Sequence, residues 1–172
     1  MSISEMKPNS IVFTSKNGNT QKYAYMLGEQ ISLHVYSLEQ AYSKLSDGCP
    51  IIYLGWIHAS HVKGYSKAAK HFTVRAVLGV GLCDTGTLLD EVRSASSIPE
   101  SITLFTLQGG FNRSKLKGMD KILISMLIKG LSSKKQLTPQ DERMLKLLSK
   151  DECYVTAENL NGFLRWYKEQ YT

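Results

Sequence analysis

The sequence predicts an α/β protein built around a parallel sheet. Short apolar runs alternate with helical patterns through the first two thirds of the chain, which is typical of repeated βαβ units. The run 50–57 is apolar almost throughout, as a strand buried on both faces must be. With 172 residues, 42% of them hydrophobic, the chain is expected to form one domain over 1–172.

The first half of the chain alternates strands with two helices. Between the first two strands, Ala24, Leu27, Gly28 and Ile31 recur at helical spacing, so a helix is expected to lie close against the sheet. A brief helix is also expected at 38–45. The expected strands in this half are 11–14, 33–36 and 50–57.

The second half continues the alternation and then becomes helical. Two more strands are expected, at 76–80 and 102–107, each preceded by a helix, at 63–72 and 88–95. Three helices follow. One covers 118–131; one is capped by Thr138 and buries Met144, Leu145 and Leu148; the last is capped by Thr156 and docks on the sheet through Leu160, Phe163, Leu164 and Tyr167.

One segment carries the whole charge imbalance of the chain, which has a formal net charge of +6. The segment 112–135 holds seven lysine and arginine residues against Asp120 alone, and it belongs to a basic helical insertion or extension at 112–150. Its cations are Arg113, Lys115, Lys117, Lys121, Lys129, Lys134 and Lys135.

The helix 118–131 has two apolar stripes. The stripe that begins at Met119 is expected to face the core. The stripe that begins at Ile124 lies nearly opposite on the helix, beside Lys117 and Lys121. Apolar residues flanked by lysines suit an anionic lipid surface, so peripheral membrane contact through 113–135 is expected, with no nucleic-acid partner. The stripes are Met119, Ile122, Leu123, Met126 and Leu127, and Ile124, Ile128 and Leu131.

The remaining composition indicates a cytoplasmic protein. Cys49, Cys83 and Cys153 are widely spaced and form no C-x-x-C pair, so reduced thiols are expected. No run of about 18 apolar residues occurs, and 1–10 lacks a secretory leader. His58 and His61 have no further ligands near them in the sequence, so no metal site is predicted.

A candidate phosphate-binding loop joins the first strand to its helix. It offers hydroxyl and amide donors around a glycine that permits a tight turn, and the helix start adds N–H groups and a positive dipole end. Its residues are Thr14, Ser15, Lys16, Asn17, Gly18, Asn19 and Thr20.

Two further loops are expected at the ends of later strands. The third strand leads into Gly55, Trp56, Ile57, His58 and Ala59, which place an indole beside a flexible glycine. The fourth strand leads into another short loop, whose residues are Gly81, Leu82, Cys83 and Asp84.

The loop 15–20 is similar to the FMN phosphate loop of flavodoxins, T/S-x-T/S-G-x-T, with Asn17 where that family more often has a hydroxyl residue. The resemblance implies a flavodoxin-like three-layer sandwich with strand order 2-1-3-4-5. It also implies non-covalent FMN, with the phosphate held by 14–20, the ring near Trp56, and its pyrimidine edge near 81–84. The third loop lacks the ring-stacking Tyr of many flavodoxins.

The stretch 108–111 and the basic helix after it also resemble the end region of bacterial menaquinone-dependent protoporphyrinogen oxidases. That match is partial, because 112–116 is plainer than the aromatic-rich basic stretch of that family. Three functions therefore stay open: an FMN electron carrier with a redox partner protein, an oxidase or quinone-linked reductase, and a non-redox regulatory domain. The sequence does not identify a catalytic acid or base, and it leaves the oligomeric state open.

Overall fold

The structure, a computed structural model, describes residues 6–172, so the start of the segment 1–10 lies outside it. The chain forms two compact units. The first contains the chain up to Gly109 together with Val155–Thr172, and the second is Gly110–Tyr154. The second unit thus includes all of 112–150. Among the described residues, no helix combines the length and the apolar character that crossing a membrane requires.

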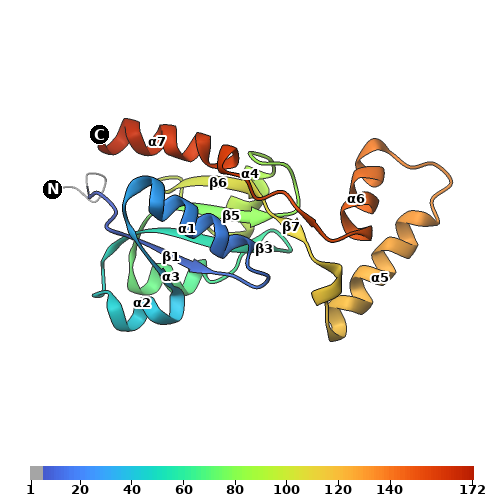
Figure 1. Cartoon of the computed structure of the whole chain (residues 1–172), viewed down its shortest axis with the longest axis horizontal. Helices are drawn as coiled ribbons and strands as arrows, with labels where there is room; N and C mark the ends of the chain where they lie inside the picture. Colours follow the sequence, from blue (N-terminus) through green and yellow to red (C-terminus); the bar gives the residue numbers. More distant parts are fainter. Residues whose placement is uncertain (1–5) are drawn as a thin grey trace. The chain divides into compact units, whose positions relative to one another are not determined.

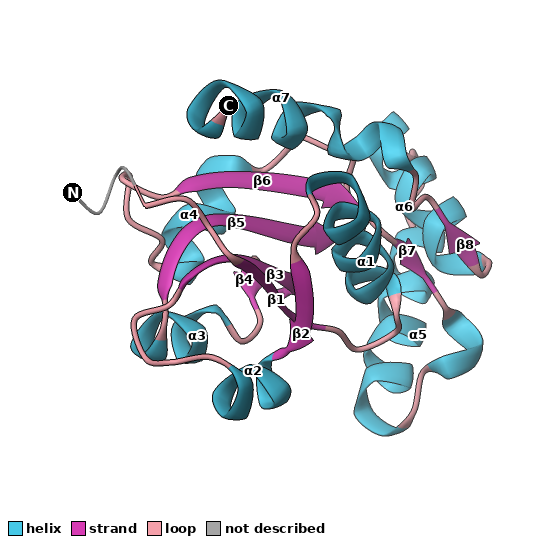
Figure 2. Cartoon of the chain, turned by 60° about the vertical axis from the view of Figure 1, so that its left-hand side comes forward, coloured by secondary structure: helices cyan, strands magenta, loops and turns pink. Residues whose placement is uncertain are grey.

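The first unit is built around a six-stranded, mostly parallel sheet (Figures 1 and 2). Its hydrogen-bonded order is β2-β1-β3-β5-β6, and β4 pairs antiparallel with β3 alone. The α/β class is therefore confirmed. The short β4 was not predicted, because two residues give no periodic signal. The bounds are β1 Ser10–Thr14, β2 His34–Ser37, β3 Pro50–His58, β4 His61–Val62, β5 Thr73–Gly81 and β6 Thr103–Gln108.

Helices cover both faces of this sheet. The helices α1 (Asn19–Ile31) and α7 (Asn161–Tyr171) pack on one face, and α2 (Leu38–Lys44), α3 (Tyr65–His71) and α4 (Leu89–Ser96) pack on the other. The alternation of side chains along β1 divides the core in the same way, since Ile11 and Phe13 face the first pair and Val12 the second group. The central strand β3 has Ile51–Leu54 fully buried, as its apolar sequence predicts.

The two helices on the first face pack as their sequence patterns predict. In α1, a Cβ added at Gly28 would lie 2.5 Å from Val35 Cγ2, so only glycine allows this close approach to β2. In α7, Phe163 and Tyr167 are buried together with the preceding Leu160, which confirms the predicted docking on the sheet. The predicted cap at Thr156 is wrong in detail, because its side chain makes no cap bond. A 3-10 helix at Ala157–Leu160 begins there instead.

The second unit contains two helices and a two-stranded ribbon. The helices are α5 (Gly118–Ser132) and α6 (Pro139–Ser149), and the antiparallel strands are β7 (Gly110–Phe111) and β8 (Glu152–Cys153). The predicted Thr138 cap is confirmed: its hydroxyl accepts from the Asp141 N–H at 3.1 Å, and the Asp141 carboxylate accepts from the Thr138 N–H at 3.0 Å. Leu148 is fully buried.

The structure corrects the predicted core face of α5. Met119, Ile122, Leu123, Met126 and Leu127 are exposed, by 45% to 69%. The opposite stripe of Ile124, Ile128 and Leu131 is half-buried instead. The sequence could not decide between the two stripes, because both are apolar and both repeat at helical spacing.

Candidate functional site

The predicted binding segments lie at the carboxyl ends of neighbouring parallel strands. The segment 15–18 follows β1, the turn at Ala59 and Ser60 follows β3, and the segment 82–88 follows β5. The chain leaves β1 for β2 on one side, while β3 pairs with β1 on the other, so the strand order reverses there. Open α/β sheets bind ligands at such switch points.

The first loop turns tightly at Gly18, directly before α1. Gly18 has φ +92°, a backbone conformation that favours glycine, and its N–H donates to Ser15 Oγ at 3.1 Å. The start of α1 has no side-chain cap and no acidic residue in its first turn. The positive end of the helix dipole therefore faces this loop, and the first turn of α1 itself has no carboxylate to offset it.

The seven predicted residues of this segment differ in how accessible they are. Lys16 and Asn17 are exposed, Ser15 and Asn19 are half-buried, and Thr20 is only 1% exposed. Asn19 also lies beside the end of β6, since a Cβ added at Gly109 would be 3.6 Å from the Asn19 Cβ. The side chains that a ligand could reach directly are therefore those of 15–17.

Thr14 is engaged with the core of the sheet. The hydroxyl of the buried Tyr53 lies 2.8 Å from both Thr14 Oγ1 and the Lys63 carbonyl oxygen. Tyr53 has one hydroxyl proton, and a carbonyl can only accept, so Thr14 must donate to Tyr53. Burial raises the pKa of Tyr53 well above its usual range, which keeps this proton in place. The Thr14 hydroxyl therefore holds β1 to β3.

The second predicted loop proves to be mostly strand. We expected Gly55–Ala59 to follow the third strand, but β3 continues through His58 and pairs with β4 in a hairpin. The two connecting residues, Ala59 and Ser60, have φ values of 48° and 62°. Turns with two positive φ values match the twist of paired strands and usually contain Gly or Asn, so this sequence carries no standard hairpin signal.

The half-buried Trp56 brings the first loop and β3 together. The Lys16 Nζ atom lies 5.1 Å from the Trp56 ring centroid, and the Lys63 Nζ atom lies 6.0 Å from it. The His58 ring is 5.6 Å away. Sequence reasoning included Trp56, Lys16 and His58 and missed Lys63. Its position depends on the unpredicted hairpin, so no local signal could have found it.

Hydrogen bonds to β6 hold the third loop in place. Gly86 N–H donates to the Thr106 carbonyl at 2.9 Å, and the Thr106 hydroxyl donates to the Thr87 carbonyl at 2.7 Å. Gln108 donates twice: its N–H to Thr85 Oγ1 at 2.9 Å, and its side-chain amide to the Leu82 carbonyl at 3.3 Å. The loop after β5 is therefore a fixed wall of the site.

A small cavity lies between this wall and the end of β3. Its volume is about 50 Å³, and the predicted residues Ile57, Gly81, Leu82, Cys83 and Asp84 all line it. Ligand sites in proteins usually enclose about 300 Å³ or more. The cavity is therefore too small to enclose a ligand by itself.

Cys83 is a poor nucleophile in this setting. Partial burial of its thiol raises its pKa, and the nearby Asp84 and Glu91 carboxylates raise it further. Only the thiolate attacks electrophiles, so Cys83 is mostly inert at neutral pH. The exposed Cys83 therefore contributes a protonated thiol to the cavity wall at neutral pH.

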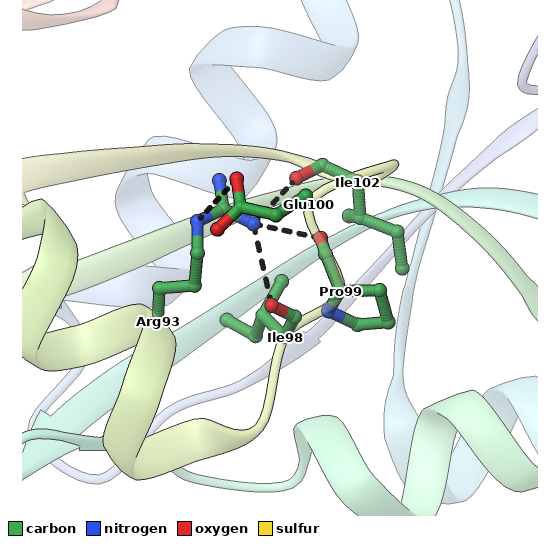
Figure 3. Close-up of polar contacts among 5 residues, drawn as sticks. All are labelled: Arg93, Ile98, Pro99, Glu100 and Ile102. Atoms are coloured by element: carbon green, nitrogen blue, oxygen red, sulfur yellow. Dashed lines mark hydrogen bonds and ion pairs between the residues drawn. The ribbon is translucent and has the colours of Figure 1, made fainter.

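The segment that joins α4 to β6 is held by Arg93 of α4 (Figure 3). Its Nη1 atom is within hydrogen-bond distance of three backbone carbonyls, those of Ile98 at 3.3 Å, Pro99 at 2.7 Å and Ile102 at 3.1 Å. Glu100 lies 3.7 Å from its Nε atom, but that carboxylate is mostly exposed and contributes little. Arg93 thus ties α4 to the segment that enters β6.

Comparisons of the chain with models of protein families, with curated proteins and with solved structures give no match. The class that the fold and the site define is an α/β protein with a mostly parallel sheet and a cationic, aromatic site at its switch point.

Proposed function

We propose that the first unit is a flavodoxin-like domain that binds FMN non-covalently and takes part in electron transfer. The observation that carries the proposal is the meeting of an uncapped, acid-free helix start, Lys16 and Trp56 at one switch point. A phosphate suits the positive helix end and the lysine, and a flat apolar ring suits the indole. Leaving out the two-residue β4, the strand order corresponds to 2-1-3-4-5, the flavodoxin order.

The donor set fits the phosphate end of FMN. Ser15, Lys16 and Asn17 offer a hydroxyl, an ammonium and an amide on one short loop, and Gly18 has no heavy atom within 4 Å of an added Cβ, so the loop is open at that point. The Thr14 hydroxyl is committed to Tyr53, so we assign it to the scaffold. When bound, FMN supplies electron transfer through its isoalloxazine ring.

The ring end fits less tightly. Trp56, the cavity wall at 81–84 and the hairpin turn would border it, and the cavity can take only an edge. One face or edge of the ring would then be accessible to an electron donor or acceptor. This accessibility also favours our second candidate, an oxidase or quinone-linked reductase, in which a small substrate or a quinone approaches the exposed ring.

Absorption spectroscopy tests the proposal. Purified protein, or apoprotein to which FMN is added, should show a flavin spectrum that is bleached by dithionite and returns in air. An apoprotein that leaves the fluorescence of added FMN unchanged would refute FMN binding. A bound flavin that cannot be reduced would favour a regulatory domain. Turnover with protoporphyrinogen and a menaquinone would support the oxidase, and inactivity would favour the electron carrier.

A further inference from the structure

The second unit carries an apolar stripe on the exposed side of α5. Met119, Ile122, Leu123, Met126 and Leu127 are 45% to 69% exposed and repeat at i, i+3, i+4, i+7 and i+8, which places them on one helix face. The opposite stripe is half-buried, and α5 packs against α6. No described residue of the second unit buries the exposed stripe, which we call the α5 outer face.

Lysines border the α5 outer face. Lys121 and Lys129 line a shallow hollow on the helix together with Ile122, Ser125 and Met126. Helical spacing places Lys129 beside Ile122 at one edge of the stripe and Lys121 farther round the helix on the same side. Asp120 lies beside Leu127 at the other edge. Asp120 is the only acidic residue in 112–135. The outer face is therefore apolar with cations along one side, which complements a surface with an apolar interior and anionic headgroups.

We propose that the α5 outer face binds the surface of an anionic lipid bilayer. The helix would lie in the interface plane, with its five apolar side chains at the boundary of the acyl chains and the ammonium groups of Lys121 and Lys129 among the anionic headgroups. Long lysine side chains reach the headgroups while their methylene stems cover apolar surface. With 15 residues, α5 would lay about 22 Å of helix on the membrane.

Two other occupants fit this face less well. Protein interfaces usually centre on Trp, Tyr or Arg anchors, and the stripe has no aromatic side chain and no arginine. A second copy of the chain would bring two lysine-bordered faces of the same charge together. Aliphatic and methionine side chains beside lysines match lipid best.

Vesicle sedimentation with the full chain tests the proposal. The protein should sediment at low salt with vesicles of phosphatidylcholine containing roughly 30% phosphatidylglycerol, and should be released by high salt or by pure phosphatidylcholine. Replacing both lysines (K121Q/K129Q) should weaken partitioning about 25-fold, at roughly fivefold per lysine near an anionic surface. Met126→Ser should also weaken it. The matched control K67Q/K70Q, on exposed α3, should change it less than about twofold.

Leu123→Trp gives a second readout that does not depend on charge. After subtraction of the emission of the unsubstituted chain, the added indole should shift to shorter wavelength only with anionic vesicles, and brominated lipids should quench it. No sedimentation, equal sedimentation of K121Q/K129Q and K67Q/K70Q, or emission of the Leu123→Trp variant unchanged by vesicles would overturn the proposal. Dimerisation without vesicles that K121Q/K129Q strengthens would assign the face to a second copy. Apoprotein suffices for both assays, so the result is independent of FMN.

Discussion

Thr14 and Ser15 are adjacent hydroxyl residues, and the structure assigns them different roles. The Thr14 hydroxyl donates to Tyr53 and joins β1 to β3, whereas Ser15 Oγ accepts from Gly18 N–H inside the loop. Because an accepting hydroxyl keeps its own proton, Ser15 can still donate to a phosphate. Thr14→Val should therefore lower stability and spare FMN affinity, and Ser15→Ala should mainly lower FMN affinity.

The size of each effect follows from the bonds lost. Thr14→Val removes one hydrogen bond within the protein, which costs about 1 kcal/mol, or about 2–4 °C in Tm for a chain of this size. Ser15→Ala removes a hydrogen bond to a charged phosphate, worth about 1.5–3 kcal/mol. That corresponds to a Kd for FMN that rises roughly 10- to 150-fold. The substitution also removes the bond that Ser15 Oγ accepts from the Gly18 N–H, so Tm should fall as well, but by less than in Thr14→Val, because water can reach this open loop.

Thermal unfolding of apoprotein and fluorescence titration with FMN measure the two effects separately. Tyr53→Phe is the matched control: it should lower Tm at least as much as Thr14→Val, because it removes the bond to the Lys63 carbonyl as well as the bond to Thr14. It should leave the Kd for FMN within about threefold. A Thr14→Val variant that binds FMN as weakly as Ser15→Ala would refute this assignment of roles. So would a Ser15→Ala variant with unchanged affinity.

Three further changes test other parts of the structure. Arg93→Lys should lower the free energy of unfolding by about 1–3 kcal/mol, because an ammonium cannot reproduce the guanidinium contacts to three carbonyls. Glu100→Gln should change the free energy of unfolding little. If chemical denaturation shows equal losses for Arg93→Lys and Glu100→Gln, the role given to Arg93 is contradicted. The rate of Cys83 alkylation, followed by peptide mass spectrometry, should rise only at higher pH than in the urea-unfolded chain. Asp84→Asn should speed it at about pH 8 by removing a charge that raises the thiol pKa. Hydrogen bonds from Lys134 and Thr138 lower the pKa of the Asp141 carboxyl group in the folded chain. The charged carboxylate therefore stabilises the folded chain at pH values above the pKa that Asp141 has when unfolded, and this stabilisation is lost as the pH falls below about 4. In the Asp141→Asn variant, the decrease in helicity between neutral and acid pH, measured by circular dichroism, should be smaller than in the unsubstituted chain.

The sequence predicted the parallel sheet well because its signals are local. The apolar run of β3 and the glycine turn before α1 each depend on a few neighbouring residues, and both are found where they were expected. Docking of α7 was also predictable, since Phe163 and Tyr167 recur at core spacing.

The sequence predicted the site less completely because its geometry depends on pairing between distant residues. The hairpin at Ala59 and Ser60 lacks the usual turn residues, so neither β4 nor the approach of Lys63 to Trp56 could be predicted. The bond between Thr14 and Tyr53 joins residues 39 positions apart. In α5 the difficulty was different: two apolar stripes gave equal signals, and only packing decided which one is exposed.

The most direct test of the central claim compares the affinities of apoprotein for FMN and for riboflavin. The two ligands share the ring and differ in the phosphate, so the ratio of their Kd values measures what the phosphate contributes to binding. If that loop and the start of α1 hold the phosphate, FMN should bind at least about 100-fold more tightly than riboflavin, since two or more charge-assisted bonds are gained. Equal affinities for the two flavins would contradict the account.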